Sequence, residues 1–330
     1  MKKTFKFLTL TVLLSMVGVL SAFADTVKSG ATEFNDPNGL SVAYKLLTID
    51  EDDQTGTVEV SGSAINPNVT EITIPATVTL TPNVTLMEAG HSYNKETVFT
   101  VVGIRVGFAT LHELKTVNIP LCVEYISQGA FNNCSKLTNF NIGDPSKTAA
   151  QETSKLKAIG DFAFGDTGLK KLDLSKCAKL NLSDDWTLPE AANWDGIPFI
   201  SHDSGENQVL EEVIIPDNVQ IGQSLAGLTA LKKLHQDADG NNHYSGDLWP
   251  RALMGSGLEN LILDAPTEPT VNTQYIGEEA FKNFKIKKLV INAPIALNEA
   301  IRDEAFVGMK DLEEVYFNGL LAVEDAIPCV

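Results

Sequence analysis

A short sequence pattern returns along this chain about eight times, and it constrains the fold more than any other feature. In its clearest copy, residues 159–164 read Ile-Gly-Asp-Phe-Ala-Phe and residues 169–174 read Leu-Lys-Lys-Leu-Asp-Leu. The copies share an Ala-Phe pair, or a close substitute, followed by Leu-x-x-Leu/Val-x-Ile/Leu. The intact pairs are Ala130-Phe131, Ala163-Phe164, Ala280-Phe281 and Ala305-Phe306. The degenerate pairs are Gly107-Phe108, Pro198-Phe199, Ser224-Leu225 and Ala252-Leu253.

The spacing of these pairs indicates the type of repeat. Most successive pairs lie 23 to 28 residues apart, and two spacings of 33 and 35 residues are longer. A period of about 20–29 residues with this leucine pattern marks a leucine-rich repeat, and longer spacings mark insertions. We expect the insertions near residues 143–153 and 183–208. Solenoids of this kind offer extended surfaces for binding.

The second half of each copy alternates apolar and polar residues, as a strand with one buried face does. In the last copy, Val315 and Phe317 alternate with Glu314 and Tyr316. One repeat cannot bury its own apolar residues, so strands of neighbouring coils should pair in parallel. The Ala-Phe pairs would then fill the interior from the opposite wall, where each buried Phe contributes ~1.5–3 kcal/mol. The sequence therefore predicts a leucine-rich-repeat solenoid with one continuous parallel β-sheet and about eight irregular coils.

The combined motif resembles the BspA-like leucine-rich repeat family. Residues 159–164, 276–281 and 114–120 carry the resemblance, and Cys134 follows Phe131 at the place where that family often has a cysteine. The likeness covers about residues 99–318. It implies a secreted or surface protein of host-associated bacteria that binds host matrix or other cells, and it brings no catalytic residues. The chain departs from the pattern in its degenerate pairs and its two insertions.

The N-terminal residues are typical of a secretory signal peptide. Lys2 and Lys3 precede an apolar stretch at residues 8–20, and Ala22-Phe23-Ala24 offers a small-x-small cleavage site. We therefore interpret residues 1–24 as a signal peptide; the alternative is an uncleaved anchor. No second run of 18 apolar residues follows, so no membrane span is expected after cleavage. The expected location is the extracellular space, the cell surface or the periplasm.

The remaining chain divides into two predicted parts. Residues 25–98 alternate like short strands separated by turn residues, and an open solenoid end needs a cover. We expect this segment to be a small β-rich module that caps the array. Residues 99–330 form the predicted repeat domain.

Charge and cysteine content narrow the partner classes. The chain has 43 acidic and 25 basic residues, a net charge of −18, which argues against nucleic acid and anionic membranes as partners. Its four cysteines have no zinc-site spacing. They allow three complete disulfide pairings, among which the sequence does not choose. At Cys134 a packed thiol is the favoured interpretation.

Two clusters contain residue types used in catalysis or metal binding. His202, Asp203 and Ser204 are consecutive, whereas a catalytic triad needs side chains that converge through space. Asp237-x-Asp239-Gly240 resembles the start of a calcium loop, but the sixth and twelfth positions do not match. Asp and Gly are also ordinary turn residues, and calcium binding at Asp237 and Asp239 stays open. We expect no catalytic residues, no cofactor, no metal site and no enzymatic activity.

The exposed face of the sheet is the predicted binding surface. Its outward positions turn from polar to partly apolar toward the C-terminal copies, and exposed apolar residues mark contact sites. The predicted partner-binding residues are Asn260, Ile262, Lys288, Val290, Glu314 and Tyr316. We expect a macromolecular partner, a protein or a glycan at a cell surface, for a secreted or surface-bound, adhesin-like protein. The alternative function is a structural or assembly component of the bacterial envelope. An alternative for the six residues is that the tail 318–330 covers them.

Overall fold

The structure is a computed structural model that describes residues 33–35, 42–50, 54–62, 65–80, 96–105, 107–180, 209–216, 221, 225–248, 250–265, 275–294 and 301–319. Its named elements are all β-strands joined by turns. Within these ranges, no helix has the length and apolar character needed to cross a membrane. The predicted signal peptide and His202, Asp203 and Ser204 lie outside the described residues.

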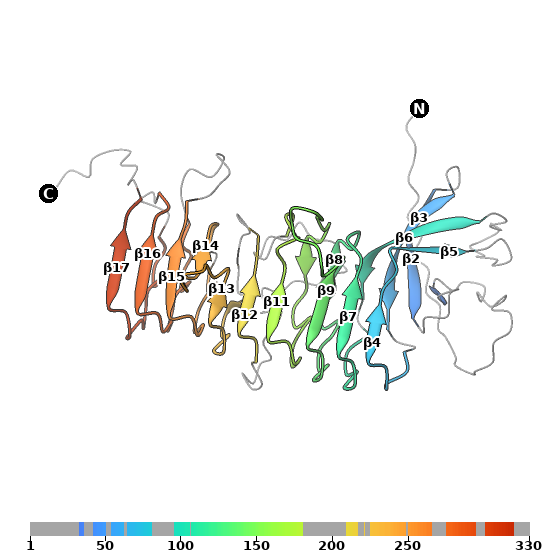
Figure 1. The fold of residues 1–330 in the computed structure, drawn as a ribbon, viewed down its shortest axis with the longest axis horizontal. Helices are drawn as coiled ribbons and strands as arrows, with labels where there is room; N and C mark the ends of the chain where they lie inside the picture. Colours follow the sequence, from blue (N-terminus) through green and yellow to red (C-terminus); the bar gives the residue numbers. More distant parts are fainter. Residues whose placement is uncertain are drawn as a thin grey trace, which may run out of the picture.

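Short strands follow one another along the long axis of the molecule and form what we call the first wall (Figure 1). Each comes from the Leu-x-x-Leu/Val-x-Ile part of a copy or from its equivalent. In chain order they are β4 (Glu71–Thr73), β7 (Thr116–Ile119), β9 (Asn139–Ile142), β11 (Lys171–Asp173), β12 (Glu212–Ile214), β13 (Lys233–Leu234), β14 (His243–Tyr244), β15 (Asn260–Leu263), β16 (Lys288–Ile291) and β17 (Glu314–Phe317). All the pairings between them are parallel. The leucine-rich-repeat fold with parallel strands is thereby confirmed.

The prediction of one continuous sheet is wrong, because the first wall consists of three sheets. Their strand orders are β4-β7-β9, β11-β12-β13 and β14-β15-β16-β17. The first break falls where the coil between β9 and β11 carries the insertion at residues 143–153. The second falls where a turn after β13 brings β14 alongside β15, so that β13 and β15 are no longer ladder neighbours.

The Ile-Gly part of the motif builds a second wall that the sequence analysis did not predict. Strands β6 (Thr97–Ile104), β8 (Tyr125–Ile126) and β10 (Ala158–Ile159) pair in parallel. The same row continues as single parallel bridges that join Ile221, Leu248, Ile276 and Ile301. Each coil therefore crosses from one wall to the other, and the apolar residues of both walls meet in the interior.

The N-terminal segment is continuous with both walls. Strands β1 (Glu33–Asn35), β2 (Ala43–Asp50), β3 (Thr55–Ser61) and β5 (Thr77–Leu80) join β6 in a mixed sheet. Strand β4 meanwhile pairs with β7, so the first wall begins before residue 98. The cap, the division at residue 98 and the count of eight coils stay predictions.

The described Ala-Phe pairs lie in the interior, as predicted, except that Phe306 is only partly buried, and Pro198-Phe199 lies outside the described residues. Phe131, Phe164 and Phe281 are at most 1% exposed. The rings of neighbouring coils are in contact, with centroids 5.8 Å apart for Phe131 and Phe164 and 5.3 Å apart for Phe281 and Phe306. The aromatic side chains therefore form one stack through Phe108, Phe131 and Phe164 and a separate one through Phe281 and Phe306, in addition to the leucines.

Among the described residues, the turns around the Ala-Phe pairs use the left-handed backbone region at two recurrent places. The first place is the residue before the Ala, which has a positive φ at Gly129, Phe162, Arg251, Glu279 and Glu304. The second lies two residues after the aromatic or its substitute, at Thr110, Asn133, Asp166, Gly227, Gly255, Asn283 and Gly308. Gly, Asn and Asp tolerate this region best, which explains why they recur at the second place.

The last strand corrects one further expectation. Val315 and Phe317 were predicted to be buried, but they are 39% and 55% exposed. Their counterparts in β16, Leu289 and Ile291, are buried. A strand in a solenoid buries its inner face only when coils lie on both sides of it, and among the described residues β17 has a paired neighbour on one side alone.

The described cysteines are free thiols. Cys134 is buried with its Sγ 3.1 Å from the carbonyl oxygen of Phe108, and burial raises its pKa to about 11. Burial likewise raises the pKa of Cys177 to about 12. Cys122 is half-buried and also free. The packed-thiol interpretation of Cys134 is confirmed, and Cys329 lies outside the described residues.

Candidate functional site

The six predicted contact residues lie together on the face of β15, β16 and β17 that points away from the interior, which we call the outer face. Strand register places Asn260 beside Lys288 and Lys288 beside Glu314. It places Ile262 beside Val290 and Val290 beside Tyr316 in the same way. We call the first set the polar row and the second the apolar row. The structure thus brings all six together, while binding by them stays a prediction.

Tyr316 stands at the end of the apolar row and is held by both of its polar neighbours. The Nζ of Lys288 lies 5.4 Å from the centroid of the Tyr316 ring, and the Tyr316 hydroxyl donates to Oε2 of Glu314 at 3.1 Å. The ring is nevertheless 47% exposed. These contacts restrict the side chain without burying it, which lowers the ordering cost of binding a partner.

A third row, which sequence reasoning missed, borders the apolar row. Asp264, Asn292 and Asn318 each follow a strand directly, and their backbone N–H groups donate to Tyr244, Leu263 and Ile291 at 2.8 Å. Their side chains are linked in turn: Asn318 donates to Asn292 at 3.0 Å, and Asn292 donates to Asp264 at 3.5 Å. We call these three residues the amide row. The one available sequence signal is a polar residue after the strand in consecutive copies.

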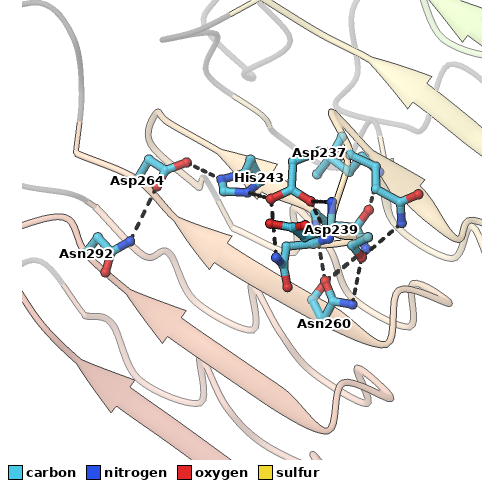
Figure 2. Close-up of polar contacts among 11 residues, drawn as sticks. Asp237, Asp239, His243, Asn260, Asp264 and Asn292 are labelled. Atoms are coloured by element: carbon cyan, nitrogen blue, oxygen red, sulfur yellow. Dashed lines mark hydrogen bonds and ion pairs between the residues drawn. The ribbon is translucent and has the colours of Figure 1, made fainter.

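The apolar row continues into a histidine that lies between two carboxylates. Strand β14 places His243 in register with Ile262. As Figure 2 shows, its ring reaches Asp264 on one side and Asp237 on the other. The Nδ1 atom lies 2.6 Å from Oδ2 of Asp264, and Nε2 lies 3.0 Å from Oδ2 of Asp237. Burial by itself lowers the pKa of His243, but the hydrogen bonds to both carboxylates outweigh it and the pKa is raised.

Asp237 also organises the turn between β13 and β14. Its Oδ1 accepts hydrogen bonds from the backbone N–H groups of Asp239 at 2.9 Å and Asn241 at 2.8 Å. The backbone hydrogen bond from Asn241, followed by the contact with His243, lowers the pKa of Asp237 to about 2. The segment that resembled a calcium loop therefore has a structural role in this turn. Nowhere in the described part of the chain do three or more Asp, Glu, His or Cys side chains form a group able to hold a metal ion.

A cavity of about 360 Å³ opens beside His243 at the ends of β13, β14 and β15. Its walls combine apolar side chains with acidic, amide and imidazole groups, and no Lys or Arg is among them. The lining residues are Ile215, Pro216, His235, Gln236, Asp237, His243, Tyr244, Ser245 and Asp264. We call it the His243 pocket. Sequence reasoning missed it because its walls come from separate coils.

The pocket contains Ser, His and Asp, but its geometry does not suit nucleophilic catalysis. A catalytic histidine needs one ring nitrogen free to accept the proton of the nucleophile while the other is held by the acid. In this site both ring nitrogens of His243 face carboxylates. His243 is therefore not placed to take a proton from Ser245, and its arrangement suits recognition better than acyl transfer.

Comparison with known proteins identifies the family. The model of the BspA type leucine rich repeat region matches residues 105–225 and 263–325, in six copies. No curated protein matches the chain.

Solved structures of bacterial leucine-rich repeat proteins also resemble the chain. One is a leucine rich cell surface protein from Faecalibacterium prausnitzii A2-165, with 14% identity, 88% of this chain and 95% of that chain covered, and a TM-score of 0.29. The leucine-rich repeat protein of T. pallidum has 14% identity, coverages of 82% and 92%, and a TM-score of 0.36. One from Bacteroides ovatus ATCC 8483 has 20% identity, coverages of 84% and 75%, and a TM-score of 0.28.

The family model spans more than half of the chain. The resemblance seen in the Ala-Phe repeat is therefore confirmed, and the chain belongs to the BspA-type leucine-rich repeat family.

Proposed function

We propose that this protein is an exported, non-enzymatic binding protein of the cell surface. The outer face of β15, β16 and β17 would be its contact surface for a macromolecular partner. The observation that carries the proposal is the apolar row, whose members lie in register between two polar rows and end on an exposed tyrosine. A compact apolar centre with a polar rim is the usual composition of a binding hot spot.

The N-terminal sheet of the same wall provides an internal comparison. At the outward positions of β7 and β9 it presents Thr116, Asn118, Asn139 and Asn141. These side chains are polar, and Asn141 donates to Asn118 at 2.8 Å, so they partly satisfy one another. The face thus changes character along one solenoid built from the same repeat. The change favours a dedicated contact region in the C-terminal coils over a uniformly solvated surface.

Export is inferred from the leader-like residues 1–24, and the non-enzymatic assignment from the family, whose repeat brings no catalytic residues. The partner would be a protein or a glycan of a cell surface or extracellular matrix. Nucleic acid is the least suitable partner, because the net charge of −18 repels phosphates.

A pair of tyrosine variants tests the proposal. Tyr316 has Lys288 over its ring on the outer face, and Tyr275 has Arg302 over its ring beside the second wall. Saturable binding of the chain without residues 1–24 to cultured cells and to immobilised matrix proteins would be measured for Tyr316→Ala and Tyr275→Ala. We expect Tyr316→Ala to lose ~2 kcal/mol, about 30-fold in affinity, and Tyr275→Ala to bind as the parent does. Equal binding by both variants would contradict the placement.

The exposed last strand favours a second candidate, assembly into a larger structure. Val315, Tyr316 and Phe317 expose apolar area on both faces of β17. An exposed strand edge with apolar side chains is a template for pairing with another chain. Light scattering over a concentration series separates the candidates. Growth in mass that Phe317→Asp abolishes supports assembly, whereas a constant mass with intact cell binding supports the first proposal.

A further inference from the structure

We propose that the His243 pocket accepts the ammonium or guanidinium group of a lysine or arginine side chain on a protein partner. The inference rests on the proposed function, because it makes the pocket a subsite at the end of the apolar row. It commits the partner to the protein class and to a segment that carries a basic side chain next to apolar ones.

Charge complementarity is the first support. Asp237 and Asp264 both contribute carboxylates to the pocket wall, and no Lys or Arg lines it. The uncharged part of the wall includes Ile215 and Pro216, which suit the aliphatic stem of a long basic side chain. A volume of about 360 Å³ is at the small end of ligand pockets. It therefore fits one side chain better than a folded module.

The second support is the position of the pocket relative to the apolar row. His243 is in register with Ile262, which is in register with Val290 and then Tyr316. Neighbouring strands are about 4.8 Å apart. His243 and the apolar row therefore lie in one line across the strands, so that a segment lying along this row reaches His243 and the pocket mouth. The acidic surplus of the whole chain would draw such a basic segment toward this face.

Protonated His243 occupies the charge position that a ligand cation would take. It is hydrogen-bonded to Asp264 at the end of β15 and to Asp237 in the turn after β13, and His235 lines the same pocket. A ligand cation beside Asp264 would lie close to a charged imidazole, and like charges at such distances repel. Binding of the cation should therefore oppose protonation of His243. Linkage then requires the affinity to rise with pH through the pKa of His243, by up to about tenfold per pH unit.

Two peptides that differ by one acetyl group test the charge requirement. The probes are Ac-Ala-Leu-Lys-Leu-Ala-NH₂ and the same peptide with Nε-acetyl-lysine, titrated into the chain without residues 1–24 and followed by NMR at pH 6 and pH 8. We expect the lysine peptide to bind at least tenfold more tightly than the acetylated one, and more tightly at pH 8 than at pH 6. Equal binding of both peptides overturns the proposal. So does binding of maltotriose without binding of the lysine peptide, which would indicate a glycan.

Matched variants locate the binding. Asp264→Asn should weaken the lysine peptide at least tenfold, whereas Asp303→Asn removes an equal charge from an exposed position outside the pocket and should have no effect. His243→Gln should remove the pH dependence. Equal weakening by both Asp variants would contradict the pocket assignment. If Asp264→Asn does not fold, the comparison of the two peptides on the parent chain still tests the proposal. If the lysine peptide does not bind but cell binding still depends on Tyr316, this inference alone is overturned. If the lysine peptide binds in the pocket but cell binding does not depend on Tyr316, the proposed function is overturned.

Discussion

Asn242 donates hydrogen bonds to Asn260 from both its backbone and its side chain, across the gap between β13 and β15. The backbone N–H of Asn242 donates to Oδ1 of Asn260 at 2.8 Å, and Nδ2 of Asn242 donates to the carbonyl oxygen of Asn260 at 3.2 Å. On its other side, Asn242 accepts from the N–H of Leu234 at 2.8 Å and donates to the carbonyl oxygen of Lys232 at 3.2 Å. One buried amide thus replaces a peptide unit and joins two sheets of the first wall.

Removing this amide should be costly. Asn242→Ala leaves the N–H of Leu234 and the carbonyl oxygen of Asn260 without their partner, and an unsatisfied buried group costs ~1–3 kcal/mol. We expect the free energy of unfolding to fall by about that amount in urea titrations. Asn241→Ala, which changes a neighbouring amide that is only half-buried, is the control. A loss of the same size in both variants would show that the turn matters and the bridge does not.

Emptying the aromatic stack should destabilise the solenoid. Phe164 lies 5.8 Å from Phe131 and 4.8 Å from Phe140, between ring centroids, and it is almost fully buried. Phe164→Ala should therefore lower the free energy of unfolding by ~3–5 kcal/mol, the usual cost of removing a buried aromatic ring. Val307→Ala, at an exposed position, should change it by less than about 0.5 kcal/mol. Small and equal losses of unfolding free energy for Phe164→Ala and Val307→Ala in denaturant titrations would contradict a core role for the aromatic stack.

A buried carboxylate should hold the N-terminal sheet to the first coils. Glu59 in β3 is fully buried, and its Oε1 lies 3.1 Å from Nζ of Lys45 and 3.3 Å from Nε of Arg105. The hydroxyl of Tyr125 in β8 donates to Oε2 at 2.7 Å. Glu59→Ala should cost about 3 kcal/mol, at the lower end for broken buried pairs because both cations reach solvent. Tyr125→Phe should cost ~1–2 kcal/mol. An unchanged melting temperature for Glu59→Ala would contradict this role.

The raised pKa of His243 predicts that the stabilisation of the folded state by this residue decreases as the pH rises. Protonated His243 stabilises the folded state through Asp237 and Asp264, so its contribution is complete below the ordinary value of 6.5. The contribution is lost as the pH rises through the higher pKa of the folded state. The stability difference between the parent and His243→Gln should therefore be larger at pH 6 than at pH 8.5 in urea titrations. A difference that grows with pH would contradict the raised pKa.

The repeat was predictable because its determinants are local. The Ala-Phe pairs and the strand alternation recur within each copy, and burial of these residues follows from stacking alone. The six residues of the polar and apolar rows could be predicted for the same reason, since parallel register carries one outward position to the next coil. The error at Val315 and Phe317 has the opposite cause. Their burial depends on what lies beyond β17, which the pattern within the copy does not contain.

The pocket and the breaks in the sheet depend on irregularities that a repeat pattern hides. His243 meets Asp264 only because a turn organised by Asp237 places β14 beside β15. In the sequence this turn is a run of Asp, Asn and Gly, which resembles the start of a calcium loop. The turn sets the strand register because it places Asn242 beside β13, where the Asn242 side chain makes the hydrogen bonds that a neighbouring strand would otherwise make.

The most direct test of the central claim is to place a charge in the middle of the apolar row. Binding of Val290→Glu to cultured cells would be compared with that of Asn139→Glu, which adds the same charge to the outer face at β9. Circular dichroism would first establish that both variants fold. If the C-terminal outer face is the contact surface, Val290→Glu lowers the affinity at least 30-fold and Asn139→Glu leaves it within about twofold of the parent. Undiminished binding by folded Val290→Glu, or loss of binding by Asn139→Glu alone, would contradict it.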